Sequence, residues 1–176
     1  MAFSTTVFIG TSLDGYIARL DDDITWLTER GEQAGDLGFF AFLESVDAVV
    51  MGRNTYDTVV GFGEENWHYG DRHVAVLSTT MPADADPRVT VHRDLDALIA
   101  DLDARGVEHV YPDGGRLIQG FIAAGRVDRF VISVAPVLIG SGRRLFGDLA
   151  ADVPLRLDSA TEAGGGFAQL RYSVEK

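Results

Sequence analysis

Residues 109–134 contain the pattern that most restricts the fold of this chain. A short apolar strand at 109–111 is followed by a turn with two glycines, Gly114 and Gly115, and then by apolar side chains at helical spacing. A dense apolar strand follows at 130–134. Strand, turn, helix and strand in this order are typical of α/β proteins, in which a helix connects two parallel strands. The pattern therefore predicts a parallel sheet covered by helices.

The remaining segments extend the same arrangement. Continuous apolar runs predict further strands at 6–11, 47–51, 73–77 and 89–92. Amphipathic spacing and helix-start residues predict helices that begin near Asp36, Arg53 and Leu95. Two segments on either side of three consecutive glycines predict a C-terminal hairpin, at 155–161 and 167–174. We therefore predict one three-layer α/β domain over residues 1–176, with a mostly parallel central sheet, helices on both faces and a C-terminal antiparallel hairpin.

Composition excludes several classes of function. The net charge of −12 disfavours nonspecific binding to nucleic acid, and no apolar run approaches the roughly 20 residues of a membrane span. No export signal is recognised at the N-terminus, so we expect a cytoplasmic protein. The chain has no cysteine, and its three adjacent aspartates at 21–23 lack the spacing of an EF-hand loop. We therefore predict no metal site.

Two predicted strands end in glycine directly before a helix. Gly114 and Gly115 precede one helix, and Gly52 and Arg53 precede another. Glycine allows backbone N–H groups to approach a phosphate, and a helix N-terminus adds partial positive charge. A tight turn uses glycine equally well, so a single glycine pair leaves both interpretations open. Two such turns, one with an arginine in an acidic chain, favour a bound anion.

Several short motifs occur in a fixed order on these elements. Together they resemble the dihydrofolate reductase-like superfamily, and most closely the branch that includes the reductase domain of bacterial riboflavin biosynthesis. The resemblance extends from about residue 7 to residue 174. The motifs are Ser12-Leu13-Asp14-Gly15, Val50-Met51-Gly52-Arg53-Asn54-Thr55, Leu77-Ser78, Gly114-Gly115-Arg116 and Pro136-Val137-Leu138-Ile139-Gly140-Ser141-Gly142.

The resemblance implies NADPH as the cofactor. Gly114 and Gly115 would hold its pyrophosphate, while Arg53, Ser78, Thr79 and Arg116 match positions that hold the 2′-phosphate. Two guanidinium groups and two hydroxyls suit a phosphate dianion, whereas a ribose diol would need a carboxylate. The alternative is that the two arginines form surface ion pairs. The complete set of implied cofactor-binding residues is Gly52, Arg53, Asn54, Thr55, Leu77, Ser78, Thr79, Asp113, Gly114, Gly115, Arg116, Leu117 and Ile118.

The resemblance also implies the residues that meet the substrate. Asp36 falls on the acidic position of classical dihydrofolate reductases, where a helix carboxylate binds the pterin amino group and supports ring protonation. Asp36 and Asp14 are therefore the candidate catalytic residues, although Asp36 could simply cap a helix and Asp14 could simply form a turn. The implied substrate-binding residues are Ser12, Asp14, Asp36, Phe40 and Ser133, and Ser133 could instead be packed as an ordinary strand residue.

These implications give a functional prediction. We expect an NADPH-dependent oxidoreductase that reduces a pyrimidine- or pterin-like small molecule, with a phosphoribosylaminopyrimidine of riboflavin synthesis as the first choice. The alternatives are a dihydrofolate or pterin reductase, a protein that binds NADP(H) without catalysis, and a structural dimerisation module. The family likeness also suggests a homodimer. The zinc deaminase domain that often accompanies riboflavin-type reductases is absent from this chain of 176 residues.

Overall fold

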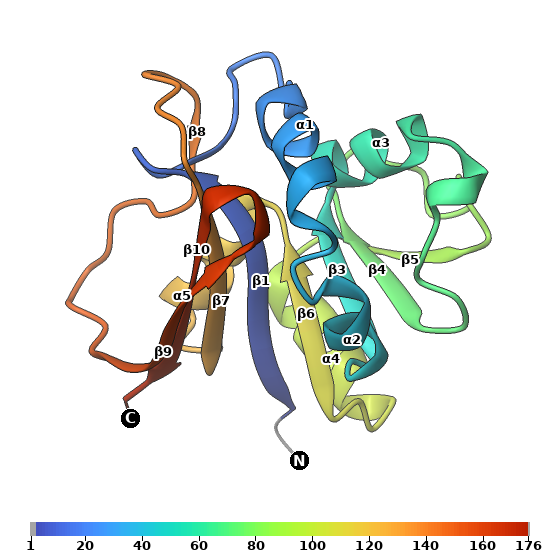
Figure 1. Ribbon diagram of the computed structural model, residues 1–176. Coiled ribbons are helices and arrows are strands. Elements are labelled where there is room, and N and C mark those ends of the chain that lie inside the picture. Colours follow the sequence, from blue (N-terminus) through green and yellow to red (C-terminus); the bar gives the residue numbers. More distant parts are fainter. Residues whose placement is uncertain (1–2, 176) are drawn as a thin grey trace.

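A computed structural model describes residues 3–175 of the chain. Its main feature is an eight-stranded sheet in the order β5-β4-β3-β6-β1-β7-β10-β9 (Figure 1). Neighbouring strands are parallel from β5 to β7, and β10 pairs antiparallel with both β7 and β9. The strands are β1 (Ser4–Ser12), β3 (Ala48–Gly52), β4 (His73–Leu77), β5 (Val89–His92), β6 (His109–Asp113), β7 (Arg129–Ala135), β9 (Leu155–Ala163) and β10 (Phe167–Val174). The predicted fold class, including the C-terminal hairpin, is confirmed.

Helices cover both faces of this sheet. They are α1 (Thr25–Ala34), α2 (Phe39–Glu44), α3 (Arg53–Gly61), α4 (Leu95–Ala104) and α5 (Gly115–Ala123). Figure 1 shows α1, α2 and α3 in front of the sheet, with α4 and α5 behind it. Successive side chains of a strand point to opposite faces, so β3 contributes to both layers. Ala48 and Val50 pack with α4 and α5, whereas Val49 and Met51 pack with α2 and α3.

The direction of the connections changes at β3 and β6, which are neighbours in the sheet. The chain runs outward from β3 to β4 and β5, whereas from β6 it crosses β1 to reach β7. The helices that follow β3 and β6 therefore leave the sheet toward opposite faces. In open α/β sheets a crevice forms at the carboxyl ends of the strands at such a switch point, and ligands bind there. The topology thus places a candidate site at the ends of β3 and β6.

Three features of the fold differ from the prediction. Helix α1 occupies a segment whose polar sequence suggested a connection, because of its residues only Trp26 is buried and the apolar periodicity is weak. A separate ribbon joins β2 (Tyr16–Ala18) to β8 (Arg143–Arg144). In addition, α2 begins at Phe39 rather than at Asp36, because Leu37 and Gly38 form a left-handed turn with φ angles of 52° and 84°. Among the described residues, no helix is long and apolar enough to cross a bilayer.

Candidate functional site

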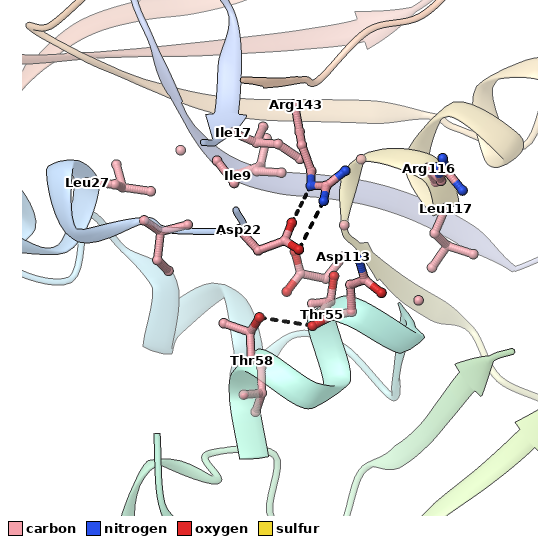
Figure 2. Close-up of a pocket in the computed structure, with 18 of the residues that line it drawn as sticks. Ile9, Ile17, Asp22, Leu27, Thr55, Thr58, Asp113, Arg116, Leu117 and Arg143 are labelled. Carbon is pink, nitrogen blue, oxygen red and sulfur yellow. Dashed lines mark hydrogen bonds and ion pairs between the residues drawn. The ribbon is translucent and has the colours of Figure 1, made fainter. Parts of the chain in front are cut away.

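A cavity of about 1240 Å³ opens at the carboxyl ends of the parallel strands. Two groups of residues line it. The first, which we call the glycine wall, contains the ends of β3, β4 and β6 and the starts of α3 and α5. The second, which we call the ribbon wall, contains β2, β8, α1, the loop around Asp22 and the segment from Asp36 to Phe39. Figure 2 shows residues of both walls, with Arg116 and Leu117 on one side and Leu27 on the other.

The glycine wall is formed by two helix N-termini that lie close together. Met51 at the end of β3 is paired with Asp113 at the end of β6, so α3 and α5 begin side by side. Gly114 has a φ of +98°, and a Cβ atom there would collide with Thr55 Oγ1. A Cβ atom on Gly115 would lie 2.8 Å from Ile17 Cδ1. Close packing of the two helix starts therefore requires Gly114, and close packing of β2 against the start of α5 requires Gly115, whether or not a phosphate binds there.

Helices α3 and α5 begin after the glycine N-caps Gly52 and Gly114, and neither helix has a side-chain cap. By contrast, the Asp94 carboxylate caps α4 by accepting a hydrogen bond from the Ala97 amide at 2.8 Å. A Cβ atom built on Gly52 would have no neighbour within 4 Å, so the start of α3 is open to the cavity. Uncapped first-turn amides suit an anion, because they supply both hydrogen-bond donors and positive partial charge.

Asp113 is a carboxylate within the glycine wall. It follows Pro112 at the end of β6 and lines the cavity close to Thr55 (Figure 2). Burial raises the pKa of Asp113 to about 6, while hydrogen bonds from the Gly114 amide and the Tyr111 hydroxyl oppose that shift. The side chain therefore changes charge close to neutral pH, at the position where α5 begins.

Arginines reach the glycine wall from three elements. Arg53 binds both carboxylate oxygens of Asp57 at 2.8 Å in an exposed ion pair, which matches the alternative interpretation of this residue. Arg116 is exposed on the first turn of α5 and lines the cavity. Arg93 was not predicted, and its Nη1 donates to the Ser78 carbonyl at 2.7 Å. Its position could have been recognised, because Arg93 directly follows strand β5 just as Arg53 follows β3.

The hydroxyl groups predicted for the 2′-phosphate also lie at this wall. Ser78 and Thr79 follow β4 and line the cavity beside Arg93. The Ser78 oxygen accepts hydrogen bonds from the Thr80 and Met81 amides at 3.3 and 3.0 Å, so its own proton is available to a ligand. All the predicted cofactor-binding residues line the cavity except Ile118, which is fully buried in the core, so the geometry does not support its predicted contact with the cofactor.

The ribbon wall contains charged groups that the sequence did not indicate. Arg143 of β8 binds Asp22 through two hydrogen bonds, of which the one from Nη2 is 3.0 Å long. Figure 2 shows this pair between Ile17 and the start of α3 at Thr55. Arg144 stacks on the Tyr16 ring, with 4.8 Å between the guanidinium carbon and the ring centroid. Apolar side chains fill the remaining surface, namely Ile9, Ile17, Leu27, Leu37, Phe39 and Phe167.

Asp36 lines the cavity and also holds the start of α2. Its carboxylate accepts hydrogen bonds from the Gly38 and Phe40 amides, both at 3.1 Å. These bonds keep the pKa of Asp36 below its usual value, and the residue is exposed. At neutral pH Asp36 is therefore an ionised hydrogen-bond acceptor rather than the partly buried acid that proton delivery would favour. Phe40 does not line the cavity, and its ring packs edge-on against His68.

Asp14 and Ser12 lie outside the set of residues that line the cavity. The Asp14 carboxylate accepts hydrogen bonds from the Ile139 and Gly140 amides at 3.3 and 2.8 Å, so it joins the turn after β1 to a distant loop. The Ser12 hydroxyl accepts from the Tyr16 amide at 3.0 Å. Their predicted roles in substrate binding and catalysis therefore stay predictions that this geometry does not support. Ser133 does line the cavity, where it accepts from Gln169 at 3.2 Å.

The class of protein follows from these features. A parallel sheet with a cavity at its switch point, flanked by two glycine-started helices, is the arrangement found in nucleotide-binding α/β proteins. Comparison with known families narrows this class, since residues 4–168 match the RibD C-terminal domain. The chain belongs to that family, and the predicted riboflavin-reductase branch of the dihydrofolate reductase-like superfamily is confirmed.

Individual relatives agree with this assignment. The uncharacterised protein YwjB of Bacillus subtilis is 34% identical over 174 residues, with 98% of each chain covered. A crystal structure from Shewanella sp. PV-4, of a protein provisionally assigned to riboflavin biosynthesis, has a TM-score of 0.88 and 37% identity over 99% of this chain and 100% of that one. The diaminohydroxyphosphoribosylaminopyrimidine deaminase/5-amino-6-(5-phosphoribosylamino)uracil reductase of Thermotoga maritima shares the fold, with a TM-score of 0.73 and 15% identity. This chain is covered to 99% in that comparison and the Thermotoga chain to 57%.

Proposed function

We propose that the protein is an NADPH-dependent reductase of a pyrimidine- or pterin-like substrate. The observation that carries the proposal is the glycine wall, where the uncapped N-termini of α3 and α5 face the same cavity. They would bind the two phosphates of the dinucleotide through backbone amides, as glycine turns do in other nucleotide-binding folds. Bound NADPH would supply hydride, and the protein would bind and orient both reactants and exclude water.

Preference for NADPH over NADH rests on the charges near the end of β4. The Ser78 and Thr79 hydroxyls and the Arg93 guanidinium lie there, and Arg53 and Arg116 add cations from the two helix starts. A 2′-phosphate dianion matches cations and hydroxyl donors, whereas a ribose diol would be recognised by a carboxylate. We therefore add Arg93 to the proposed selectors of the 2′-phosphate.

The substrate would bind in the part of the cavity that the ribbon wall lines. The cavity of about 1240 Å³ exceeds the roughly 300–1,000 Å³ of a typical single-ligand pocket, so it has room for a cofactor and a second small molecule. Apolar side chains such as Ile17 and Phe39 suit a heterocycle, and the ionised Asp36 would accept from its amino or ring N–H groups. A phosphoribosylaminopyrimidine is the first choice because the Arg143 and Arg144 side chains could attract its phosphate. Dihydrofolate or another pterin is the alternative.

A second candidate function is NADP(H) binding without catalysis. It is favoured by the exposure and lowered pKa of Asp36, because the predicted catalytic carboxylate is then ionised at neutral pH and has no proton to deliver. An assay that monitors NADPH oxidation by absorbance, with a panel of aminopyrimidines and pterins as substrates, separates the reductase from the binding protein. Turnover with any member supports the reductase. Tight NADPH binding without turnover across the panel supports the binding protein, and no binding at all contradicts both.

The selector residues provide the sharper test. Arg93→Ala and Arg116→Ala should each lower the affinity for NADPH about 10- to 100-fold, because a charge-assisted hydrogen bond contributes roughly 1.5–3 kcal/mol. Affinity for NADH should change little. Arg156→Ala is the matched control, since Arg156 pairs with Asp158 in exposed strand β9. Fluorescence titration, with Trp26 and Trp67 as reporters, measures all of these affinities. Equal losses for NADPH and NADH would contradict the 2′-phosphate assignment.

A further inference from the structure

Two histidines and an aspartate converge on the sheet face that α4 covers. His73 is the first residue of β4, His92 is the last residue of β5, and Asp101 belongs to α4. They form the one group of three potential metal ligands within the described residues 3–175. None of the three is among the described residues that line the cavity, so the proposed reductase site does not account for them.

The distances in this cluster match those around a bound transition metal. The Nε2 atoms of His73 and His92 lie 3.6 and 3.2 Å from the same oxygen of Asp101. All the ligand atoms lie within 4.8 Å of one another. In a tetrahedral site with bonds of about 2.0–2.1 Å, neighbouring ligand atoms are about 3.3 Å apart. Three atoms at this spacing leave room for one ion between them.

The hydrogen bonding of the two histidines also supports a bound metal ion. The His73 and His92 side chains are 18% and 12% exposed, and the Nε2 atom of each is buried without a hydrogen-bond partner. Buried polar atoms nearly always have a partner, and an unsatisfied one costs free energy. Both Nε2 atoms lie within ion-pair distance of Asp101, but neither has the geometry of a hydrogen bond with it. A cation between the three side chains would satisfy both nitrogens at once.

We propose that His73, His92 and Asp101 bind a divalent transition-metal ion, with zinc as the best match. Two imidazoles and one carboxylate are ligands of this class, whereas magnesium and calcium prefer sites built from oxygen alone. Water would complete the coordination. The ion would join β4, β5 and α4 into one unit. The ion would also stabilise the end of β5, where Arg93, a proposed NADPH selector, directly follows His92.

One neighbouring cation opposes metal binding. The Arg105 Nε donates to the same Asp101 oxygen at 2.8 Å, so the ion must displace Arg105 or share the carboxylate with it. Arg105→Gln should therefore raise the affinity for zinc, because it removes a competing positive charge. This sign is specific to a metal site at Asp101, since zinc bound elsewhere on the surface would not respond to Arg105.

Titration of the 176-residue chain with zinc, by calorimetry, tests the proposal. The native chain should bind one ion, and the His73→Gln/His92→Gln double variant should lose at least about 100-fold in affinity, because two of the three protein ligands are removed. His68→Gln is the matched control, because His68 lies outside the cluster, and it should bind zinc as the native chain does. Equal binding by the double variant would overturn the proposal.

A measurement on the native chain keeps the proposal testable if the double variant does not fold. X-ray absorption of the zinc-loaded native protein should show two imidazole ligands in the first coordination shell. Cobalt substituted for zinc should give the intense visible absorption of a tetrahedral site. A shell of oxygen ligands alone, or the absence of stoichiometric binding, would overturn the assignment. Neither result depends on whether the protein reduces a substrate.

Discussion

The two walls of the cavity differ in how their residues are distributed along the chain. The glycine wall is built from short continuous segments, such as Gly52–Thr55 and Asp113–Leu117, each placed where a strand meets a helix. The ribbon wall depends on pairs of residues far apart in sequence, and its central ion pair joins Asp22 to Arg143 across 121 positions. Local segments carry their own geometry, whereas distant pairs depend on the tertiary fold. A single substitution in the glycine wall therefore changes one local segment, so its effect on the predicted cofactor binding can be interpreted directly.

The largest effect is expected from Gly114→Ala, which tests whether the glycine wall depends on the close approach of α3 and α5. The positive φ of +98° should cost an alanine roughly 1–2 kcal/mol. The collision of its Cβ with Thr55 Oγ1 should add roughly 1–3 kcal/mol. We expect a marked loss of stability in denaturant unfolding, together with weaker NADPH binding because the two helix starts move apart.

Gly125→Ala separates the two causes. Gly125 also has a positive φ, of +63°, but a Cβ atom there would meet nothing within 4 Å. This control should therefore show the backbone cost alone and leave NADPH binding unchanged. A second variant, Gly114→Ala with Thr55→Ala, should recover part of the lost stability. If Gly114→Ala and Gly125→Ala behaved alike in both measurements, close packing of the helix starts would not be what defines this wall.

The sequence predicted the glycine wall better than the ribbon wall. The order of strands and helices, both glycine turns and the Ser78-Thr79 strand end could be read from local patterns, because hydrophobic periodicity and glycine turns are local properties. The ribbon formed by β2 and β8 could not, because β8 has two residues and no pattern of its own. Asp14 shows a further limit. Its motif was recognised, but its partners Ile139 and Gly140 are known only from the fold.

The next effect concerns Asp113, the ionisable group of the glycine wall. Its pKa of about 6 in the folded protein lies above the ordinary value of 3.8, so the folded state retains the proton to higher pH than the unfolded state does. Stability should therefore decrease as pH rises from about 4 to about 6 and stay lower above that range. The change could reach roughly 3 kcal/mol, at about 1.4 kcal/mol for each pKa unit.

Asp113→Asn should remove this contribution, because asparagine does not ionise. The measurement is the free energy of unfolding of both proteins, without cofactor, across this pH range. The difference between them should change with pH in the stated direction, and its pH dependence rather than its absolute size is the result that counts, since asparagine also alters the bonds with Tyr111 and Gly114. A difference that is constant with pH would contradict the raised pKa.

The smallest effect on stability is expected at Asp36, which tests the role of this residue in the substrate region. Asp36→Ala should lower the melting temperature by about 2–4 °C, because it removes the acceptor for the Gly38 and Phe40 amides at the start of α2. Asp36→Asn should lower the melting temperature by less than Asp36→Ala does, because asparagine keeps one acceptor oxygen where the carboxylate uses two.

The two Asp36 variants separate structure from chemistry because they differ in capping but share the loss of the carboxylate. If the ionised carboxylate binds the substrate, both should lower kcat/KM by a similar factor, although the alanine variant loses more stability than the asparagine variant. The affinity for NADPH should stay unchanged in both, since the cofactor would bind the opposite wall. Full activity of Asp36→Asn would reduce Asp36 to a helix cap, and the proton for reduction would then have to come from Asp113 or from water. Activity that followed the melting temperature across the native chain and both variants would lead to the same conclusion.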